Sequence, residues 1–157
     1  MKKGKVIVII AVIAAAVTLY LNKELRDSVV SAAKPHAVEH LGTPEEKLSL
    51  AVTQFYEIMG QEDMEKLPDL ISETSREKVL EKLRTTFADY DLKYTIISRE
   101  NINIADDGAV MDFVLETVLV NGKRFRNKRE TGVLTMKLVE GKWLFDSFEV
   151  KEITYLI

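Results

Sequence analysis

The sequence predicts an α+β fold, in which helices cover one face of an antiparallel sheet, behind an N-terminal transmembrane helix. Helix-type apolar periodicity is confined to residues 44–90, and strand-type alternation fills residues 92–150. Helices and strands segregated in this way are typical of α+β domains. A basic flank before a long uncharged run at the N-terminus predicts the membrane helix. The chain therefore divides into an anchor (1–22), a stalk (23–43) and a folded domain (44–157).

The composition limits the functions that the chain can have. Of the 157 residues, 46% are hydrophobic and 30% are charged, with a net charge of -3, which is typical of one globular domain with its own core. The slightly acidic balance argues against a nucleic-acid partner. The absence of cysteine excludes a disulfide framework, a thiolate zinc site and a thiol nucleophile.

The N-terminal segment is predicted to anchor the protein in the cell membrane as a single span. Lys2, Lys3 and Lys5 precede an uncharged run, Val6–Leu21 (residues 6–21), which is slightly shorter than the roughly 20 residues of a comfortable span. The lysines keep the N-terminus in the cytoplasm, so the domain is expected to be extracytoplasmic. The alternative is a signal peptide cleaved after Ala16, although the apolar run continues beyond that residue.

The stalk is interrupted at Pro35, which disfavours helical geometry at the preceding residue. The stalk contains both histidines of the chain, His36 and His40, at a spacing that metal-binding pairs can have. Only Glu39 accompanies them, so we predict a solvated linker without a metal site.

The first helix of the domain has a complete N-terminal signature. Thr43 is the expected N-cap, Pro44 suits the first helical position, and Glu46 completes a capping box. Gly60 is expected to end the helix. Apolar residues between these ends recur at the three- and four-residue spacing of one helical face: Leu48, Ala51, Val52, Phe55, Tyr56 and Met59.

Two further helices are expected before the sheet. A short one over Met64–Ile71 is limited by Pro68. The next begins at Thr74, with Glu77 as its capping partner, and ends near Tyr90. The domain is thus predicted to have three helices.

Four antiparallel strands are expected after the helices. The first runs over residues 92–104 and is bent or bulged near Arg99–Asn101. The alternating runs that follow are 110–120, 123–139 and 142–150. Asn121-Gly122 and Glu140-Gly141 separate these runs, and Asn-Gly is the strongest short signal for a two-residue hairpin, because both turn positions need positive φ.

Two segments of the domain resemble the NTF2-like superfamily. They are Ala51–Tyr56, which leads into Gln61–Asp63, and the closing segment Glu140–Asp146, whose Gly-Lys-Trp resembles the last hairpin of many such domains. The resemblance covers residues 48–157 and implies a cone of three helices packed on a curved four-stranded antiparallel sheet. Membrane-anchored members occur among Gram-positive surface proteins and as VirB8-like subunits of secretion and conjugation machines. The fold hosts enzymes, transport factors and assembly subunits, so the resemblance does not imply an activity.

Side-chain alternation separates the two faces of the predicted sheet. The inner face is apolar, apart from one threonine, and is expected to pack on the helices. Its residues are Met111, Phe113, Leu115, Thr117, Leu119, Leu134, Met136, Leu138, Trp143 and Phe145. The outer face mixes valines with charges, as a half-exposed surface does. Its residues are Val110, Asp112, Val114, Glu116, Val118, Val120, Val133, Thr135, Lys137 and Val139. The residues predicted to be buried together are Phe55, Leu83, Phe113, Leu134 and Trp143.

No catalytic, cofactor-binding or metal site is predicted, and the domain is not expected to be an enzyme. Enzymes that resemble this fold place acids, histidines or tyrosines inside the cone. No histidine lies in residues 44–157, and the strand alternation directs Asp112 and Glu116 outwards. Some tyrosines could reach the mouth of a pocket, although tyrosines at the edge of a core are common. They are Tyr56, Tyr90 and Tyr94.

Residues 123–129 form the densest basic cluster, with Arg124, Arg126 and Lys128 on one side of the expected strand. Charges of this kind protect a sheet edge from unwanted pairing, which is the simplest interpretation. The alternatives are contact with an acidic partner or with anionic lipid headgroups and, last, a nucleic-acid groove.

Two functional hypotheses follow from these patterns. The first is a membrane-anchored, non-catalytic interaction or assembly module, whose outer sheet face binds a second copy or a larger envelope, secretion or conjugation complex. More exposed valines than a solvated sheet needs favour it. Its expected contact residues are Val110, Asp112, Val114, Glu116, Val118, Lys137, Arg124, Arg126 and Lys128. The alternative is a small-molecule-binding or enzymatic domain that uses the interior of the cone, and a hollow interior with convergent polar groups would favour it.

Overall fold

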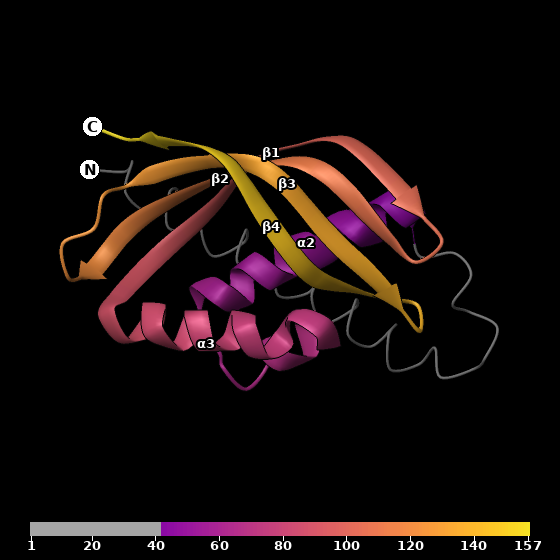
Figure 1. The fold of residues 1–157 in the computed structure, drawn as a ribbon, viewed down its shortest axis with the longest axis horizontal. Helices are drawn as coiled ribbons and strands as arrows, with labels where there is room; N and C mark the ends of the chain where they lie inside the picture. Colours follow the sequence, from indigo (N-terminus) through magenta and orange to yellow (C-terminus); the bar gives the residue numbers. More distant parts are fainter. Residues whose placement is uncertain (1–41) are drawn as a thin grey trace, which may run out of the picture. The chain divides into compact units, whose positions relative to one another are not determined.

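The computed structural model describes residues 42–157, which form a curved four-stranded antiparallel sheet with two α-helices on one face (Figure 1). The strands lie side by side in chain order. The elements are α2 (Pro44–Gly60), η2 (Leu67–Leu70), α3 (Glu73–Asp89), β1 (Tyr90–Ala105), β2 (Gly108–Gly122), β3 (Lys128–Val139) and β4 (Lys142–Tyr155). The predicted anchor, nearly all of the predicted stalk and both histidines lie outside the described residues.

The start of α2 is fixed by the predicted capping box. The Glu46 backbone N–H donates to Thr43 Oγ1 at 3.2 Å, and the Thr43 backbone N–H donates to Glu46 Oε2 at 2.8 Å. Pro44 lies in the first turn, where its missing N–H leaves no hydrogen bond unmade. The helix ends at Gly60, so both predicted ends are confirmed.

The predicted set of three helices is wrong for its second member and shifted for its third. The segment Met64–Ile71 forms only the single 3₁₀ turn η2, because Pro68 lacks the N–H that a longer helix would need. Helix α3 begins at Glu73, and its N-cap is Ser72 in place of the predicted Thr74. The Ser72 backbone N–H donates to the carbonyl of Phe145 in β4 at 2.8 Å, and this tertiary contact sets where the helix begins.

The strands contain the predicted bend and one of the two predicted turns. The register of β1 with β2 shifts between Ile96 and Ser98 and again further along, where Asn101 has a φ of 49°. Glu140 and Gly141 connect β3 to β4 with φ values of 50° and 77°, as a tight turn with two left-handed residues requires.

The predicted turn at Asn121-Gly122 is wrong. β2 continues through both residues, which pair with the first two residues of β1, and only Gly122 has a positive φ, 120°. β3 begins at Lys128, so residues 123–127 form a loop. The local turn signal is overridden because β1 is long enough to pair with the end of β2.

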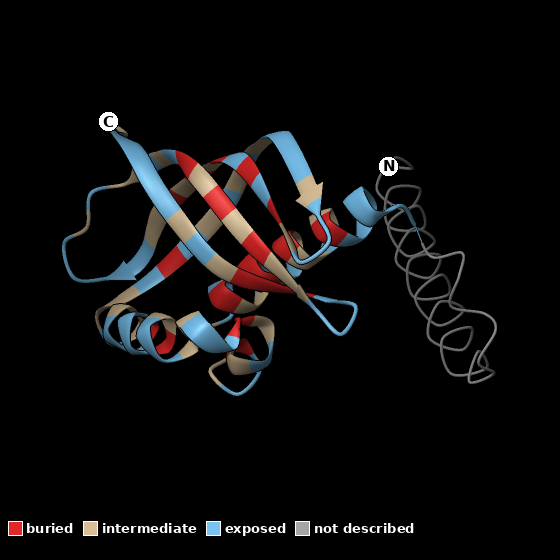
Figure 2. Ribbon diagram, turned by 45° about the vertical axis from the view of Figure 1, so that its right-hand side comes forward, coloured by how far each residue is buried: buried red, intermediate tan, exposed pale blue. Residues whose placement is uncertain are grey.

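The two faces of the sheet follow the predicted alternation, and buried residues alternate with more exposed ones along the strands (Figure 2). All five residues predicted to be buried together belong to one hydrophobic core. Fully burying each such side chain contributes about 1.5–3 kcal/mol. They are Phe55, Leu83, Phe113, Leu134 and Trp143.

β4 is an edge strand whose first half is partly covered. Ile71 forms a parallel bridge with Phe145 on its free side. On its other side β4 packs tightly against Gly132 of β3, where a Cβ atom would lie 2.1 Å from the carbonyl oxygen of Glu149. Only glycine therefore fits at this position of the curved sheet.

Candidate ligand-binding cavity

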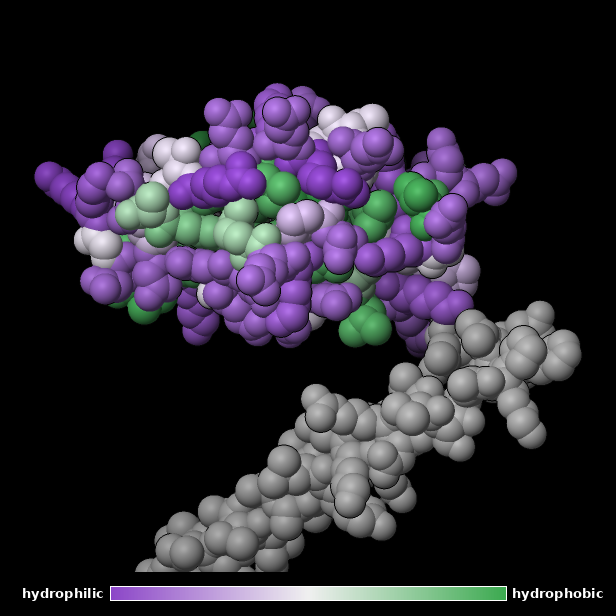
Figure 3. Space-filling model, turned by 90° about the horizontal axis from the view of Figure 1, so that it is seen from below, coloured by the Kyte–Doolittle hydropathy of each residue, from purple (hydrophilic) through white to green (hydrophobic). Residues whose placement is uncertain are grey.

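The helix-bearing side of the domain is largely hydrophilic, with hydrophobic residues confined to a narrow band (Figure 3). Inside, a cavity of about 480 Å³ lies between α3 and the inner face of the sheet. Its exposed lining residues mark a mouth between α3 and β4. They are Lys78, Lys82, Ser147 and Val150. Ligand pockets typically measure about 300–1,000 Å³. The interior of the cone is therefore hollow enough to hold a small molecule.

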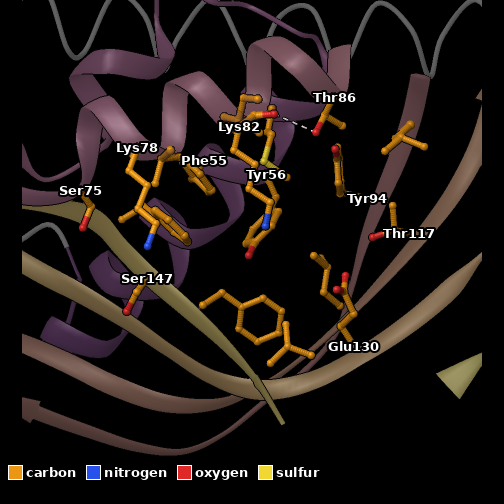
Figure 4. Close-up of a pocket in the computed structure, with 18 of the residues that line it drawn as sticks. Phe55, Tyr56, Ser75, Lys78, Lys82, Thr86, Tyr94, Thr117, Glu130 and Ser147 are labelled. Carbon is orange, nitrogen blue, oxygen red and sulfur yellow. Dashed lines mark hydrogen bonds between the residues drawn. The ribbon is translucent and has the colours of Figure 1, made fainter. Parts of the chain in front are cut away.

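Four polar side chains from four different elements point into this cavity (Figure 4). They are Tyr56 from α2, Tyr94 from β1, Thr117 from β2 and Glu130 from β3. Apolar side chains form most of the remaining wall, which includes the stacked rings of Phe55 and Phe145 with centroids 4.3 Å apart. The cavity thus combines apolar walls with a few convergent polar groups.

The two tyrosines inside the cavity are neutral hydrogen-bond donors. Tyr56 is only 6% exposed, and its hydroxyl has no hydrogen-bond partner among residues 42–157. Burial raises the pKa of Tyr56 far above its ordinary value, and the nearby Glu130 and Tyr94 raise this pKa further. Burial, with the charges of Glu62 and Glu130, raises the pKa of Tyr94 to about 12. Both phenols therefore keep their protons at neutral pH, and each hydroxyl can donate a hydrogen bond to an acceptor on a ligand.

Glu130 supplies an acceptor beside these donors. Its Oε1 accepts a hydrogen bond from Lys128 Nζ at 2.8 Å, and the two side chains are only 14% and 26% exposed. The ion pair balances the negative charge within the cavity wall. The second carboxylate oxygen of Glu130 can accept a hydrogen bond from a ligand hydroxyl or amine.

Two lysines lie at the mouth of the cavity. Lys78 and Lys82 are one helical turn apart on α3, so their side chains lie on the same face of the helix. Neither forms an ion pair with any other residue of the described domain. The mouth therefore carries two positive charges that the domain does not neutralise.

Asp146 of β4 connects the sheet to the start of helix α3, which forms one wall of the cavity. Its carboxylate accepts hydrogen bonds from the hydroxyls of Ser72, Thr74 and Ser75, and it lies 3.3 Å from Lys137 Nζ. Burial raises the pKa of Asp146, but the hydrogen bonds from Ser72, Lys137 and Ser75 outweigh it and hold the pKa below its ordinary value. Lys137, a predicted contact residue, is thus engaged with α3 and β4.

The remaining predicted contact residues of the sheet lie on its outer face, which no helix of residues 42–157 covers. They are Val110, Asp112, Val114, Glu116 and Val118. Asn101 Nδ2 donates to Asp112 at 2.6 Å, and Arg129 pairs with Glu116 at 2.7 Å. Both carboxylates are therefore held by neighbours on their own sheet.

The predicted basic side of residues 123–129 does not form, because β3 begins only at Lys128. Arg124 and Arg126 lie in the loop before it, and the Arg126 guanidinium stacks on the Tyr155 ring at 3.8 Å from the centroid. Lys128 lines the cavity and pairs with Glu130. Lys128 therefore belongs to the cavity wall, whereas Arg126 packs on the end of β4.

Glu130 and Lys128 are interior residues that were not predicted as such. The predicted inner face of β3 covers only Leu134, Met136 and Leu138. Continued by the same alternation, the inner face passes Gly132 and reaches Glu130 and Lys128. The alternation could therefore have identified both, but Lys128 was assigned to a solvated basic hairpin and Glu130 was given no role.

In residues 42–157 no helix is both long enough and apolar enough to cross a membrane. The same residues contain no group of three or more His, Cys, Asp or Glu side chains that could hold a metal ion.

Residues 51–156 match the family described as "Anti-sigma-I factor RsgI9, C-terminal domain". The chain belongs to this family. The matched range runs from the middle of α2 to the end of β4. It includes every residue that lines the cavity. No match is found among curated proteins.

Solved structures relate this domain to the NTF2-like fold. The "Putative calcium/calmodulin dependent protein kinase II association domain" from Xanthomonas campestris is 18% identical, with a TM-score of 0.56 over 73% of this chain and 90% of that one. The "Putative Scytalone Dehydratase" from Novosphingobium aromaticivorans is 14% identical, with a TM-score of 0.53 over 72% and 87%. These similarities confirm the expected NTF2-like fold and extend to the fold alone.

Proposed function

We propose that residues 42–157 form a non-catalytic regulatory domain that binds a small amphipathic molecule in its interior cavity, within a protein anchored in the membrane by residues 1–22. Family membership supports the regulatory role, because the family takes its description from an anti-sigma factor. A ligand-binding domain would supply the signal to which such a protein responds.

One observation carries the proposal: the hydroxyl of Tyr56, a residue that is only 6% exposed, borders the cavity and has no hydrogen-bond partner in the described domain. A polar group in the wall of a mostly apolar cavity favours an occupant that pairs with it. A carbonyl or ether oxygen of a ligand would accept from the Tyr56 and Tyr94 hydroxyls. The apolar walls would bind the body of the same molecule.

Binding is better supported than catalysis. A general base needs a carboxylate that is free to take a proton, whereas Glu130 is paired with Lys128 at 2.8 Å. Tyr56 and Tyr94 retain their protons because their pKa values are raised, so they act as donors and not as bases. We therefore assign to these groups the role of orienting a bound ligand.

The test uses the purified full chain in nonionic detergent and the neutral fluorescent probe N-phenyl-1-naphthylamine. Excitation of Trp143, the single tryptophan, restricts the signal to probe bound near the domain. Thr117→Phe fills the cavity, and Thr86→Phe narrows it from α3 without adding a second tryptophan. Thr131→Phe, on the outer face, is the matched control. We expect the first two variants to lose saturable energy transfer and the control to keep it.

The result that contradicts this proposal is equally specific. Energy transfer that is unchanged in folded Thr117→Phe and Thr86→Phe would place the probe outside the cavity. Circular dichroism and thermal unfolding of each variant establish that it is folded before its binding is compared.

The anchoring part of the proposal rests on the sequence of the N-terminal segment. Lysines before Val6–Leu21 favour a cytoplasmic N-terminus and an extracytoplasmic domain. An alkaline phosphatase fusion at the C-terminus should be active, and the mature chain should begin at its original N-terminus. An inactive fusion would contradict the topology, and a mature N-terminus at Val17 would contradict the uncleaved anchor.

A second candidate function is contact with a protein partner through the outer sheet face. Val110 and Val120 are 42% and 62% exposed there, and no helix of residues 42–157 covers them. The double variant Val114→Lys/Val118→Lys should remain folded and weaken self-association or recovery of a complex. Wild-type sedimentation and pull-down behaviour of that variant would exclude this function.

A further inference from the structure

We infer that the ligand of the cavity is an amphipathic anion with an aromatic body, whose acidic group lies at the mouth between Lys78 and Lys82. The inference rests on the proposed ligand-binding function and adds the chemical class and the orientation of the ligand.

The charge distribution around the cavity is the first support. Both acidic lining residues are already paired: Glu130 with Lys128 at 2.8 Å and Asp146 with Lys137 at 3.3 Å. Lys78 and Lys82 are the charges of the lining without an ion-pair partner in residues 42–157. The cavity therefore presents a net positive charge, and it presents that charge at one place.

The positions of the polar groups give the ligand a direction. The lysines are exposed on α3 at the mouth, whereas Tyr56 and Thr117 are 6% and 3% exposed at the other side of the cavity. Donor hydroxyls inside and ammonium groups outside would hold a molecule with a neutral acceptor at its inner end and an anion at its outer end. A charged group at the inner end would lose its hydration next to the apolar wall, so the reverse orientation is unfavourable.

The walls determine the shape of the ligand body. Aromatic rings line the cavity from α2 and from the sheet, among them Phe55, Phe145 and Phe148. Aromatic side chains bind flat rings through offset stacked and edge contacts. These contacts add binding energy beyond the contribution of the buried area. The cavity is therefore better suited to an aryl or fused-ring acid than to a flexible alkyl chain.

Two probes that differ in one group test the charge. 1-Anilinonaphthalene-8-sulfonate has the ring system of N-phenyl-1-naphthylamine plus a sulfonate. Both are titrated into the full chain under the conditions above, with excitation of Trp143. In Lys78→Gln/Lys82→Gln the affinity for the sulfonate should fall about fivefold, because exposed charge pairs contribute modestly, while the affinity for the neutral probe stays within about twofold.

The matched control removes two charges that do not line the cavity. Lys47→Gln/Lys93→Gln also removes two positive charges from the domain. Both lysines are exposed, and neither lines the cavity. It should leave both affinities unchanged. The preference for the sulfonate in the wild type should also shrink when sodium chloride is raised to about 1 M, where the Debye length is about 3 Å.

The outcomes separate the two proposals. If neither probe enters the cavity, as judged by Thr117→Phe, the proposed function is overturned. A neutral probe that enters the cavity, together with a sulfonate whose affinity does not depend on the two lysines, would overturn only the anionic class. For the ring body, 2-naphthoate should displace the neutral probe at lower concentration than decanoate, and the opposite order would overturn that part.

Discussion

The two ends of the interior are built from the same strands but are filled differently. At the end near the β3–β4 turn, the inner residues Met111, Leu134 and Met136 are at most 2% exposed and none lines the cavity. We call this the filled end. At the end near loop 123–127, the inner residues line the cavity. We call this the hollow end, and its residues on β2 and β3 are Leu115, Thr117, Lys128 and Glu130.

The difference shows what decides whether an alternating strand forms a solid core. Alternation sets which side chains point inwards at both ends, but the opposing elements set how much space they fill. The filled end faces Leu48 and Val52 of α2 together with Leu67 of η2, all fully buried. The hollow end faces α3, whose lining positions include polar residues such as Lys78 and Thr86. A cavity therefore persists where polar helix positions oppose a sheet.

The largest expected effect is at the filled end. Phe113 is fully buried and its ring contacts Tyr56 and Phe148, with both centroid distances at 5.4 Å. Phe113→Ala should lower the free energy of unfolding by about 3–5 kcal/mol, as truncation of a large buried aromatic side chain does. Urea unfolding followed by Trp143 fluorescence measures this. A loss below about 1 kcal/mol would mean that this end is not tightly packed.

A matched pair of leucines compares the two ends directly. Leu134 is 0% exposed in the filled end, and Leu115 is 4% exposed but borders the cavity. Within the range of about 2–5 kcal/mol for Leu→Ala, Leu134→Ala should lie near the top and Leu115→Ala near the bottom. The reason is that Leu115 already lacks neighbours on one side. Equal losses in urea unfolding would contradict the distinction between the ends.

Two buried hydroxyls give a smaller contrast. Ser72, 2% exposed, donates to Asp146, whereas Thr117, 3% exposed, has no hydrogen-bond partner in the described domain. Ser72→Ala should cost about 1–2 kcal/mol, because it removes a hydrogen bond to a charged group. Thr117→Val should change stability by less than about 0.5 kcal/mol. A clear loss in Thr117→Val would reveal a hydrogen bond that the cavity supplies.

The smallest effect concerns pH. The pKa of Asp146 is below its ordinary value of 3.8, so its carboxylate stabilises the folded state above that pH. This contribution is lost as the pH falls through the lower folded-state pKa. Asp146→Asn should therefore be less stable than the wild type at neutral pH and should lose less stability between about pH 4 and pH 2. Parallel pH dependences in thermal unfolding would contradict this role of Asp146.

Local features of the domain were predictable from the sequence, and features that depend on distant pairing were not. The Thr43–Glu46 capping box and the Glu140-Gly141 turn depend only on neighbours in the chain, and both were predicted. The turn at Asn121-Gly122 was predicted wrongly, because β1 pairs with residues that a local signal assigns to a hairpin. The start of α3 was shifted for a similar reason, since it depends on contacts with β4.

The candidate site was predictable only in part. Tyr56 and Tyr94 were identified as tyrosines within reach of a pocket mouth, although the edge of the core was the favoured place for them, and Thr117 was predicted as an interior hydroxyl. Glu130 follows from the same strand alternation but was not predicted. The cavity itself was not predictable, because its volume depends on the distance between α3 and the sheet and no local pattern encodes that distance.

The sheet has two free edges, and the far half of β4 is the more exposed to pairing with another chain. The Ile71–Phe145 bridge covers only the first half of that edge. Beyond it, charged side chains alternate in sign from Glu149 through Lys151 to Glu152, and the register with β3 shifts between Thr131 and Gly132. Charges and bulges on an edge strand oppose the addition of a foreign strand. Such an edge resists strand addition at high protein concentration without a covering element from residues 42–157.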